Sequence, residues 1–312
     1  MITKNYVPSH KAALYFNELV PLRGQSKRCA FFGHFYHPPD PDVPLTRPVV
    51  ALPNGGWGVV HDTDVNDIVC GGSYFERDDK RSLLAVFRFG ETYIYEGTSR
   101  IGVPKPPGVG FLSWVKVISG GTYACGSQNA VYRLDGRVWV DVASTLRVNY
   151  GGPGDPVLNA IDGFNEQDIY AVGYNGSIVH FDGSQWRRIE TPTNQHLHQV
   201  LCHTDGRIYL CGRGGTVFRG GMNAWEDLSL PGYEEDFWGL TAFDGQVYVC
   251  TYKRLFRVID GGLTDEVVRV NSAGSFYRLA SNESCLWATT GTGRVLRFDR
   301  KDWVELIWPD SV

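Results

Sequence analysis

The stretch that decides the fold is IDGFNEQDIYAVGYNGSIVHFDGSQWRRIETPT, residues 161–193. Three apolar or alternating runs, DIYAVG, SIVHF and QWRRIE, are separated by Asn175-Gly176 and Asp182-Gly183, dipeptides that favour tight hairpin turns. The apolar run VLNAI at 157–161 precedes them and supplies one more strand. This stretch therefore predicts four short antiparallel strands that follow one another along the chain.

The same pattern recurs at a nearly fixed spacing. With Tyr170 of IYAVG as the reference position, the equivalent position returns every 39 residues toward the C-terminus. It is occupied downstream by Tyr209, Tyr248 and Trp287, and upstream, less regularly, by Tyr123, Ile68 and Ala30. A period near forty with four strands per repeat is typical of a β-propeller. We therefore predict an all-β, seven-bladed β-propeller with four antiparallel strands per blade, formed by residues 1–312 as one domain.

The first part of the chain departs from the regular pattern. The clear repeats cover about residues 28–308, and residues 1–25 form a leading segment. Within it, LYFNELV at 14–20 is predicted to be the innermost strand of blade 1, and TKNYV at 3–7 could help to close the ring. Blade 7 holds four predicted strands of its own, so no strand exchange at closure is evident. The prolines of HPPDPDVP, 37–44, cannot donate ladder hydrogen bonds and predict an irregular or missing third strand in blade 1.

Composition and charge argue against several classes of protein. A net charge of −4 argues against general nucleic-acid binding, which needs a clustered positive surface. The opening residues lack the apolar core of a signal peptide, and no apolar run approaches the ~20 residues that span a membrane. Cysteines at equivalent positions of different blades, Cys70, Cys125, Cys211 and Cys250, would lie too far apart for disulfides. We expect a cytoplasmic protein without membrane contact, with these cysteines as small buried side chains.

The third and fourth predicted strands carry a second regularity. A basic residue on the third strand is followed six residues later by a large apolar residue, as in Arg133 with Trp139 and His180 with Trp186. We predict that these residues face each other across the hairpin near the rim, as structural cation–aromatic pairs.

The repeat resembles those of the bacterial propellers related to the Kelch, BNR and YVTN groups. The resemblance rests on a run such as IYAVG, then a strand ending in Phe-Asp or Leu-Asp, then a Trp, and it covers about residues 28–308. It implies the fold and says almost nothing about function. The sequence has no Gly-His dipeptide followed by a Trp-Asp, the combination found in WD40 repeats, and it has no Asp-box. Kelch repeats are longer, and no residues match sialidase chemistry.

Catalytic motifs do not stand out. His34 and His37 lie near acidic residues, and His196 and His198 form a His-x-His pair, which makes these four weak candidates for a metal site without a fixed third ligand. No nucleophile elbow, phosphate loop or zinc-protease motif occurs. We therefore predict no catalytic residues and no cofactor.

Loop length gives better information about binding. Counting against blade 4 indicates insertions at 73–82, 97–110 and 144–156, all predicted in loops on one face, over blades 2 to 4. Elaborated loops on a rigid scaffold are where binding usually resides, and aromatic and Arg side chains carry most interface energy. The predicted partner-binding residues are Tyr74, Phe75, Arg77, Asp78, Asp79, Arg81, Arg100, Lys105, Arg147, Tyr150 and Asp155.

The leading interpretation is a non-enzymatic propeller that binds another protein, with an acidic or mixed-charge surface, as a toxin-neutralising (immunity-type) or assembly factor. Two alternatives stay open. One is a metal-dependent propeller enzyme, a lactonase or lyase-like hydrolase that uses the four histidines. The other is a carbohydrate-binding propeller that uses Tyr and Trp side chains on loops.

Overall fold

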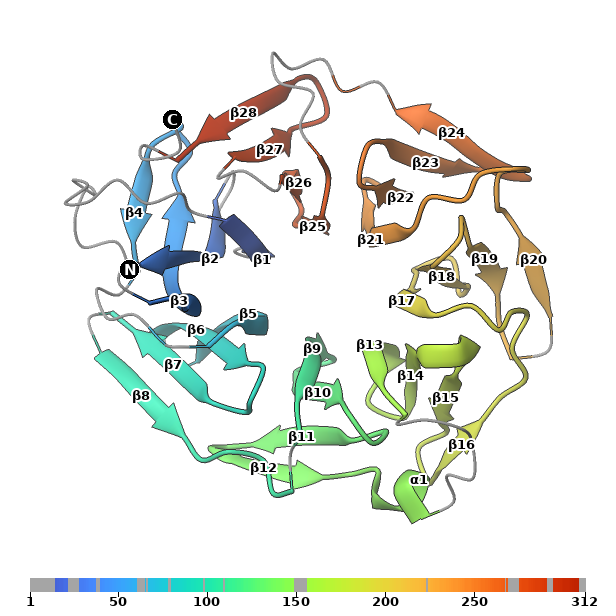
Figure 1. Cartoon of the computed structure of the whole chain (residues 1–312), viewed down its shortest axis with the longest axis horizontal. Coiled ribbons are helices and arrows are strands. Elements are labelled where there is room, and N and C mark those ends of the chain that lie inside the picture. Colours follow the sequence, from blue (N-terminus) through green and yellow to red (C-terminus); the bar gives the residue numbers. More distant parts are fainter. Residues whose placement is uncertain are drawn as a thin grey trace.

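The computed structural model describes residues 15–21, 28–37, 40–60, 65, 67–77, 80–97, 99–108, 110–148, 156–222, 224–266, 268, 275–290 and 294–308. These residues form seven four-stranded antiparallel sheets, each built from four consecutive strands and arranged around a central axis (Figure 1). The prediction of an all-β, seven-bladed propeller is confirmed. We letter the strands of each blade from a, the innermost, to d, the outermost.

The strand bounds follow the chain order. Blades 1 and 2 contain β1 (Tyr15–Pro21), β2 (Cys29–His37), β3 (Asp40–Ala51) and β4 (Trp57–Val59), then β5 (Val69–Arg77), β6 (Lys80–Phe87), β7 (Thr92–Glu96) and β8 (Ser99–Val103). Blades 3 and 4 contain β9 (Leu112–Ile118), β10 (Gly121–Gly126), β11 (Val131–Asp135) and β12 (Val138–Asp141), then β13 (Leu158–Asn165), β14 (Asp168–Gly173), β15 (Ile178–Phe181) and β16 (Trp186–Arg188). Blades 5 to 7 contain β17 (Leu197–Cys202), β18 (Ile208–Gly212), β19 (Val217–Gly220) and β20 (Trp225–Asp227), β21 (Phe237–Phe243), β22 (Gln246–Thr251), β23 (Leu255–Ile259) and β24 (Gly262–Glu266), and β25 (Arg278–Ser281), β26 (Leu286–Thr289), β27 (Arg294–Phe298) and β28 (Trp303–Ile307).

Helical structure is confined to two short pieces within the described residues, α1 (Ser144–Val148) and the 3-10 turn η1 (Tyr174–Gly176). Neither is long or apolar enough to cross a membrane.

The 39-residue period places the b strands correctly in most blades. Tyr170 lies on β14 and pairs with Asp162 on β13 and His180 on β15. The other reference residues found on b strands are Ala30, Tyr123, Tyr209, Tyr248 and Trp287. Six of the seven predicted reference residues thus lie on b strands, and Tyr170, Tyr209, Tyr248 and Trp287 do so at the 39-residue spacing.

Blade 2 is the exception, because the predicted reference residue there is wrong. Ile68 precedes β5, which is the a strand, and the b-strand position belongs to Leu84, 39 residues before Tyr123 and paired with Ile94. The segment DIVCG imitates a buried b strand, and Cys70 accordingly lies on an a strand. The strand β4, Trp57–Val59, belongs to blade 1 as its d strand.

The cysteines behave as predicted in their chemistry. All seven are free thiols. Cys125, Cys211 and Cys250 lie on b strands and are fully buried. Burial raises the pKa of each of these thiols.

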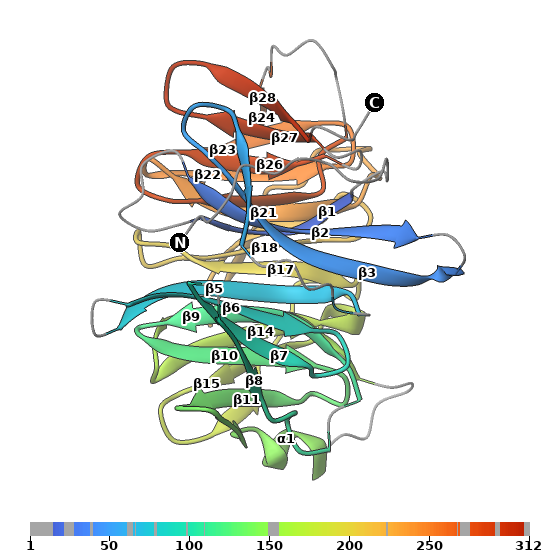
Figure 2. The same ribbon diagram turned by 90° about the vertical axis from the view of Figure 1, so that its left-hand side faces the viewer.

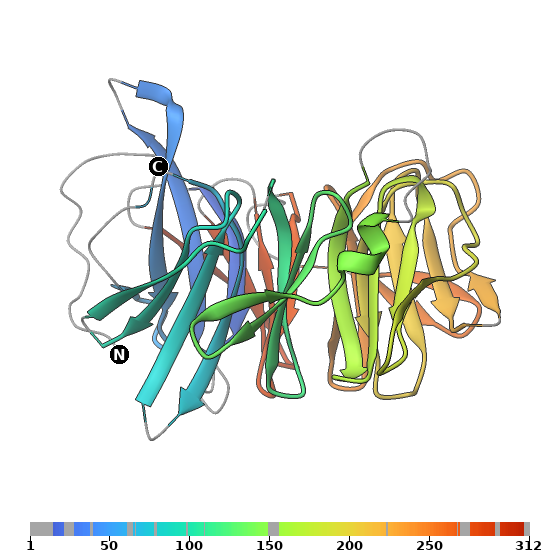
Figure 3. The ribbon, with the colours of Figure 1, turned by 90° about the horizontal axis from the view of Figure 1, so that it is seen from below.

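The third strand of blade 1 is present, but it is irregular in the part that carries Pro41 and Pro44. β2 and β3 form a long hairpin whose register runs from Cys29–Ala51 to His37–Asp40, with a shift between Tyr36 and His37. β4 pairs with residues 49–51 of β3 and Thr46 forms an isolated bridge with Val65, so among the described residues the segment 40–45 has no fourth strand beside it. Proline, which has no N–H to donate, is tolerated at such an edge. This hairpin projects from the ring (Figures 2 and 3).

The ring closes through side chains between blades 1 and 7, and both blades keep their own four strands. The Trp57 indole donates to the Ile307 carbonyl at 2.9 Å and meets Trp308 edge-on with 5.3 Å between ring centroids. These rings share a buried cluster with Trp287 and Leu306. β1 is the innermost strand of blade 1, as predicted, whereas residues 3–7 lie outside the described residues.

The predicted pairing of third-strand basic residues with fourth-strand Trp is wrong by one residue. Trp139 lies opposite Leu134, and Arg133 lies opposite Val140. Across a two-residue turn, paired positions differ by an odd number, so residues six apart lie on opposite sides of the sheet. The basic groups pack instead on the b strand, as His180 does when it stacks on Tyr170 with 4.3 Å between ring centroids.

The topology divides the turns between two faces. We call the side with the b–c turns and d–a loops the loop face; its described segments include 88–91, 104–111, 174–177, 189–196, 213–216, 229–236 and 252–254. The side with the a–b and c–d turns is the hairpin face; it includes 119–120, 136–137, 166–167, 182–185, 203–207, 244–245, 260–261, 282–285 and 299–302.

Candidate functional site

Exposed aromatic side chains gather on the loop face. Among the described residues, the large aromatic side chains classed as exposed are Phe89, Tyr174 and Tyr252, at 57%, 41% and 53% exposure. Each of them lies in a b–c turn, in blades 2, 4 and 6 respectively. On the hairpin face, Met222 is a large exposed apolar side chain, at 49%. Aromatic residues are enriched at protein interfaces, so the two faces differ in the property that favours binding.

A repeated hydrogen bond holds the loop face together. In blade after blade, a b–c turn bonds to the d–a loop that follows it. The pairs are Gln128 N–H to Pro156 O at 2.6 Å, Asn175 N–H to His196 Nδ1 at 2.9 Å, Gly214 N–H to Asp236 Oδ1 at 2.8 Å, and Phe276 N–H to Tyr252 O at 2.9 Å. These bonds join neighbouring connections of the loop face from blade 3 to blade 6.

Glycine makes the tightest of these contacts possible in blade 5. The b–c turn has Gly215 at a φ of +74°, a region that L side chains rarely adopt. A Cβ at this position would also overlap the carbonyl oxygen of Tyr233. The Gly215 N–H donates to the Glu235 carbonyl at 3.0 Å. The turn thus lies directly on the loop that enters blade 6.

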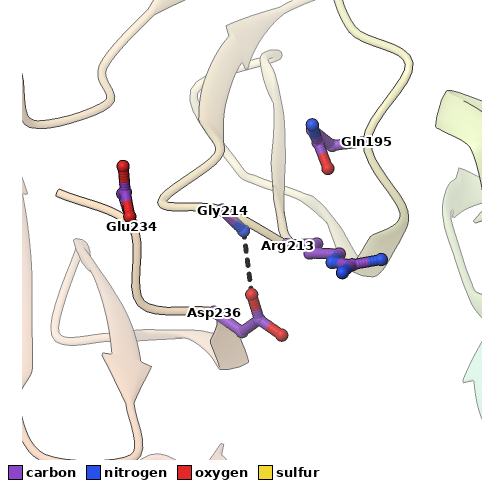
Figure 4. A pocket seen from close by; sticks show the side chains of 5 residues that line it. All are labelled: Gln195, Arg213, Gly214, Glu234 and Asp236. Atoms are coloured by element: carbon purple, nitrogen blue, oxygen red, sulfur yellow. Dashed lines mark hydrogen bonds between the residues drawn. The ribbon is translucent and has the colours of Figure 1, made fainter. Parts of the chain in front are cut away.

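A groove of about 730 Å³ lies at this junction between blades 5 and 6. It is lined by Gln195, Arg213, Gly214, Glu234 and Asp236, which come from three consecutive connections of the loop face (Figure 4). In Figure 4 the Arg213 guanidinium and the Gln195 amide lie on one side, Glu234 on the other, and Asp236 is bound to Gly214. Opposite charges therefore line one hollow.

Tyrosine residues are exposed in the b–c turns of the two blades that flank blade 5. The Tyr174 ring stacks on His196, next to Gln195, with 4.5 Å between ring centroids. Tyr252 precedes Lys253, whose Nζ donates to Glu235 Oε1 at 2.7 Å. This hydrogen bond is the main reason why the pKa of Glu235 is lowered.

A second set of rings lies at the start of the innermost strands. His198 stacks on Trp238 with 4.2 Å between ring centroids, and Trp238 stacks on Tyr277 at 6.2 Å. The Arg278 guanidinium lies 4.9 Å from the Trp114 ring, and so joins blade 7 to blade 3 across the axis. These side chains are half-buried and tie the a strands together.

Of the four histidines proposed as weak metal ligands, His196 and His198 have structural partners. His196 Nδ1 accepts the Asn175 N–H, and His198 Nδ1 lies 3.0 Å from the Phe237 carbonyl. Burial lowers the pKa of His198. His34 and His37 lie on the β2–β3 hairpin. Within the described part of the chain, no three His, Cys, Asp or Glu residues gather as metal ligands would.

The predicted insertion at 73–82 is not a loop of the predicted face. It extends the β5–β6 hairpin, an a–b connection that turns on the hairpin face, because the b strand of blade 2 lies later than predicted. Tyr74 is buried at 9% exposure, and half-buried Phe75 packs against a core cluster. Arg77 and Arg81 lie on β5 and β6, and Asp78 and Asp79 lie outside the described residues.

The other two insertions belong in part to the loop face. Lys105, in the loop after β8, pairs with Glu91 at 2.5 Å, whereas Arg100 lies on β8 with its guanidinium 4.7 Å from the Tyr93 ring. Arg147, on α1, forms an ion pair with Asp141. Tyr150 and Asp155 lie outside the described residues. These three basic side chains are thus engaged within the chain.

Sequence reasoning missed the groove. Its residues belong to short connections of ordinary composition, which become neighbours only when blades 5 and 6 pack side by side. One signal was available for the exposed aromatic side chains near it in the ring, since the turns YNG after β14 and TYK after β22 each place a Tyr in a b–c turn.

Comparison with known proteins adds one informative similarity. Over 127 residues, 40% of this chain, the sequence is 36% identical to the immune protein Tsi7 of Pseudomonas aeruginosa. The match covers 42% of the length of Tsi7. No protein-family model matches the chain. The Kelch, BNR and YVTN grouping therefore stays a prediction.

Solved structures support the architecture. YCF48 from Cyanidioschyzon merolae superposes with a TM-score of 0.65 at 13% identity, over 95% of this chain and 98% of that one. Virginiamycin B lyase from Staphylococcus aureus gives 0.62 at 13% identity, over 76% and 83%. Sqt1 from Saccharomyces cerevisiae gives 0.65 at 10% identity, over 99% and 89%. At such identities the likeness concerns the fold alone.

Proposed function

We propose that this chain is a non-enzymatic, cytoplasmic, protein-binding propeller of the toxin-neutralising (immunity) type. The observation that carries the proposal is the 36% identity to the immune protein Tsi7 over 127 residues. The similarity covers less than half of either chain, so we also propose, on the same ground, that a toxin protein is what this chain binds. Its action would be stoichiometric binding rather than catalysis.

We further propose that the loop face is the working surface. Among the described residues, it carries three exposed aromatic side chains, and it presents both signs of charge, with Arg213, Lys253 and Glu234 all exposed. Aromatic anchors within a charged surface are typical of interfaces that a mixed-charge protein partner can match. We propose that the centre of this surface lies over blades 4 to 6 rather than over blades 2 to 4, because the groove lies there and the b–c turns of blades 4 and 6 expose Tyr174 and Tyr252.

Co-expression with the protein encoded next to this chain's gene tests the proposal. We expect that protein to stop growth of a bacterial host when expressed alone, and this chain to restore growth and to co-elute with it in an equimolar complex. Unimpaired growth with the neighbouring protein, or growth arrest that this chain does not relieve, would contradict the immunity role. The hydrolase and carbohydrate-binding alternatives would then become the next candidates.

A further inference from the structure

The groove between blades 5 and 6 holds opposite charges that do not neutralise each other. The Arg213 guanidinium and the Glu234 carboxylate line the same hollow and are exposed, yet within the described residues neither forms an ion pair or a side-chain hydrogen bond. Asp236 uses one oxygen to accept the Gly214 N–H. The groove therefore presents one cationic and two anionic groups to whatever enters it.

The walls of the groove are fixed before anything binds. The Gly214 and Gly215 N–H groups are bonded to Asp236 and Glu235. Glu235 also accepts the hydroxyls of Tyr233 and Thr251, both at 3.1 Å. A loop held in this way loses little conformational entropy on binding, and the exposed charges retain their separation.

Size and borders favour an extended segment of chain. A hollow of about 730 Å³ is within the range of sites that hold several residues or a drug-sized molecule. The Gln195 amide can both donate to and accept from a peptide backbone. Tyr174 and Tyr252, exposed in the b–c turns of blades 4 and 6 on either side of blade 5, offer ring surface to a segment that extends beyond the groove.

From these observations we infer that the groove binds an extended peptide segment of the protein partner that carries an acidic and a basic side chain. The acidic group pairs with Arg213, and the basic group lies between Glu234 and Asp236. A lone anion would meet two carboxylates and a lone cation would meet a guanidinium, so the charges select a segment that bears both signs. The identity of the segment as part of the partner rests on the proposed function, whereas peptide binding can be measured without it.

A library of random 12-residue peptides displayed on phage tests this inference with the full chain as the target. The decisive variant is R213A/E234A, which removes one charge of each sign from the groove. The matched control is R207A/E283A, which removes one exposed Arg and one exposed Glu from the hairpin face. Because all four side chains are exposed, both variants should melt within about 2 °C of the wild type.

We expect the enriched peptides to contain both acidic and basic residues. They should bind R213A/E234A at least about tenfold more weakly than the wild type, the loss of one good interfacial contact, and bind R207A/E283A unchanged. Absence of any enriched peptide, or equal binding to R213A/E234A, would overturn the groove assignment.

The growth assay separates this inference from the proposed function. If R213A/E234A loses the peptides but still relieves growth arrest, the groove binds peptides and the partner docks elsewhere, which overturns the partner assignment. If the wild type binds the peptides but never relieves growth arrest, the immunity role fails while the groove stands.

Discussion

Polar side chains in the turns of blades 4 to 6 differ between the two faces of the ring. On the hairpin face, three carboxylates are bonded within the chain: Asp182 accepts from Ser184 and Gln185, Asp205 accepts from the Arg207 N–H and the Tyr209 hydroxyl, and Asp244 pairs with Arg300. On the loop face, Arg213 and Glu234 line one groove without such partners among the described residues, and exposed tyrosines lie in the b–c turns of blades 4 and 6.

Two arginines of blade 5 show the contrast at six residues' distance. Arg219, on β19, is buried and donates to Glu226 at 2.7 and 2.9 Å. Arg213, in the b–c turn, is exposed and lines the groove. The same side-chain chemistry therefore stabilises the blade in one place and is available to a ligand in the other.

Removal of a buried tryptophan should have the largest effect on stability. Trp186 is buried at 7% exposure, and its indole donates to the Val142 carbonyl of blade 3 at 3.0 Å. W186A should lower the free energy of unfolding by about 3–5 kcal/mol, measured by chemical denaturation, with unchanged affinity in the folded fraction. A loss of partner binding at an unchanged melting temperature would mean that Trp186 is a binding residue and not a structural one.

Removal of loop-face aromatics should affect affinity instead. We expect Y174A and Y252A each to weaken binding of the neutralised protein by about 2 kcal/mol, roughly thirtyfold, as measured by titration calorimetry. M222A removes an exposed apolar side chain from the hairpin face and should leave affinity unchanged. A loss with M222A and none with the two Tyr variants would reverse the assignment of the faces.

The two arginines of blade 5 offer a smaller and more local test. R219A leaves the Glu226 carboxylate without its partner and should cost about 1–3 kcal/mol of stability. R213A should change stability by no more than about 0.5 kcal/mol. Thermal unfolding of the two variants side by side measures the difference, and equal destabilisation would mean that Arg213 has a structural partner after all.

The smallest expected effect is a dependence of stability on pH. The folded-state pKa of His198 lies below the unfolded value of about 6.5, chiefly because of burial, so unfolding takes up a proton below that pH. Stability should therefore fall as pH drops from about 6.5 toward the folded pKa. H198F keeps a ring on Trp238 and cannot charge, so its melting temperature should fall less between pH 7.5 and 5.5. An equal fall in both proteins would exclude His198 as the cause.

The fold could be predicted because its information is local and repeated. Each blade from the third onward reports the same b-strand position, and the pattern of turns around it fixes the four strands. The error in blade 2 has a physical origin, since β5 and β6 are both rich in buried apolar residues and either matches the b-strand pattern alone. The structure distinguishes them, because Leu84 of β6 pairs with Ile94 of β7 in the same b–c register in which Tyr170 pairs with His180.

The candidate site could not be predicted for a different reason. Counting residues detects long connections, but the groove is made of short ones. Gln195, Arg213 and Glu234 come from separate connections, and their meeting depends on how blades 5 and 6 pack. The count also placed 73–82 on the wrong face, because one misplaced strand reverses the direction of every turn that follows within a blade.

The central claim is that the loop face binds the partner, and amide hydrogen exchange of the chain alone and in complex with the neutralised protein tests it most directly. We expect complex formation to slow exchange in the b–c turns and d–a loops around the groove, at 174–177, 193–196, 213–216, 232–236 and 252–254. Exchange in the turns at 166–167, 182–185, 203–207 and 244–245 should stay as it is in the free chain. Slowed exchange in these hairpin-face turns, with none around the groove, would contradict the account.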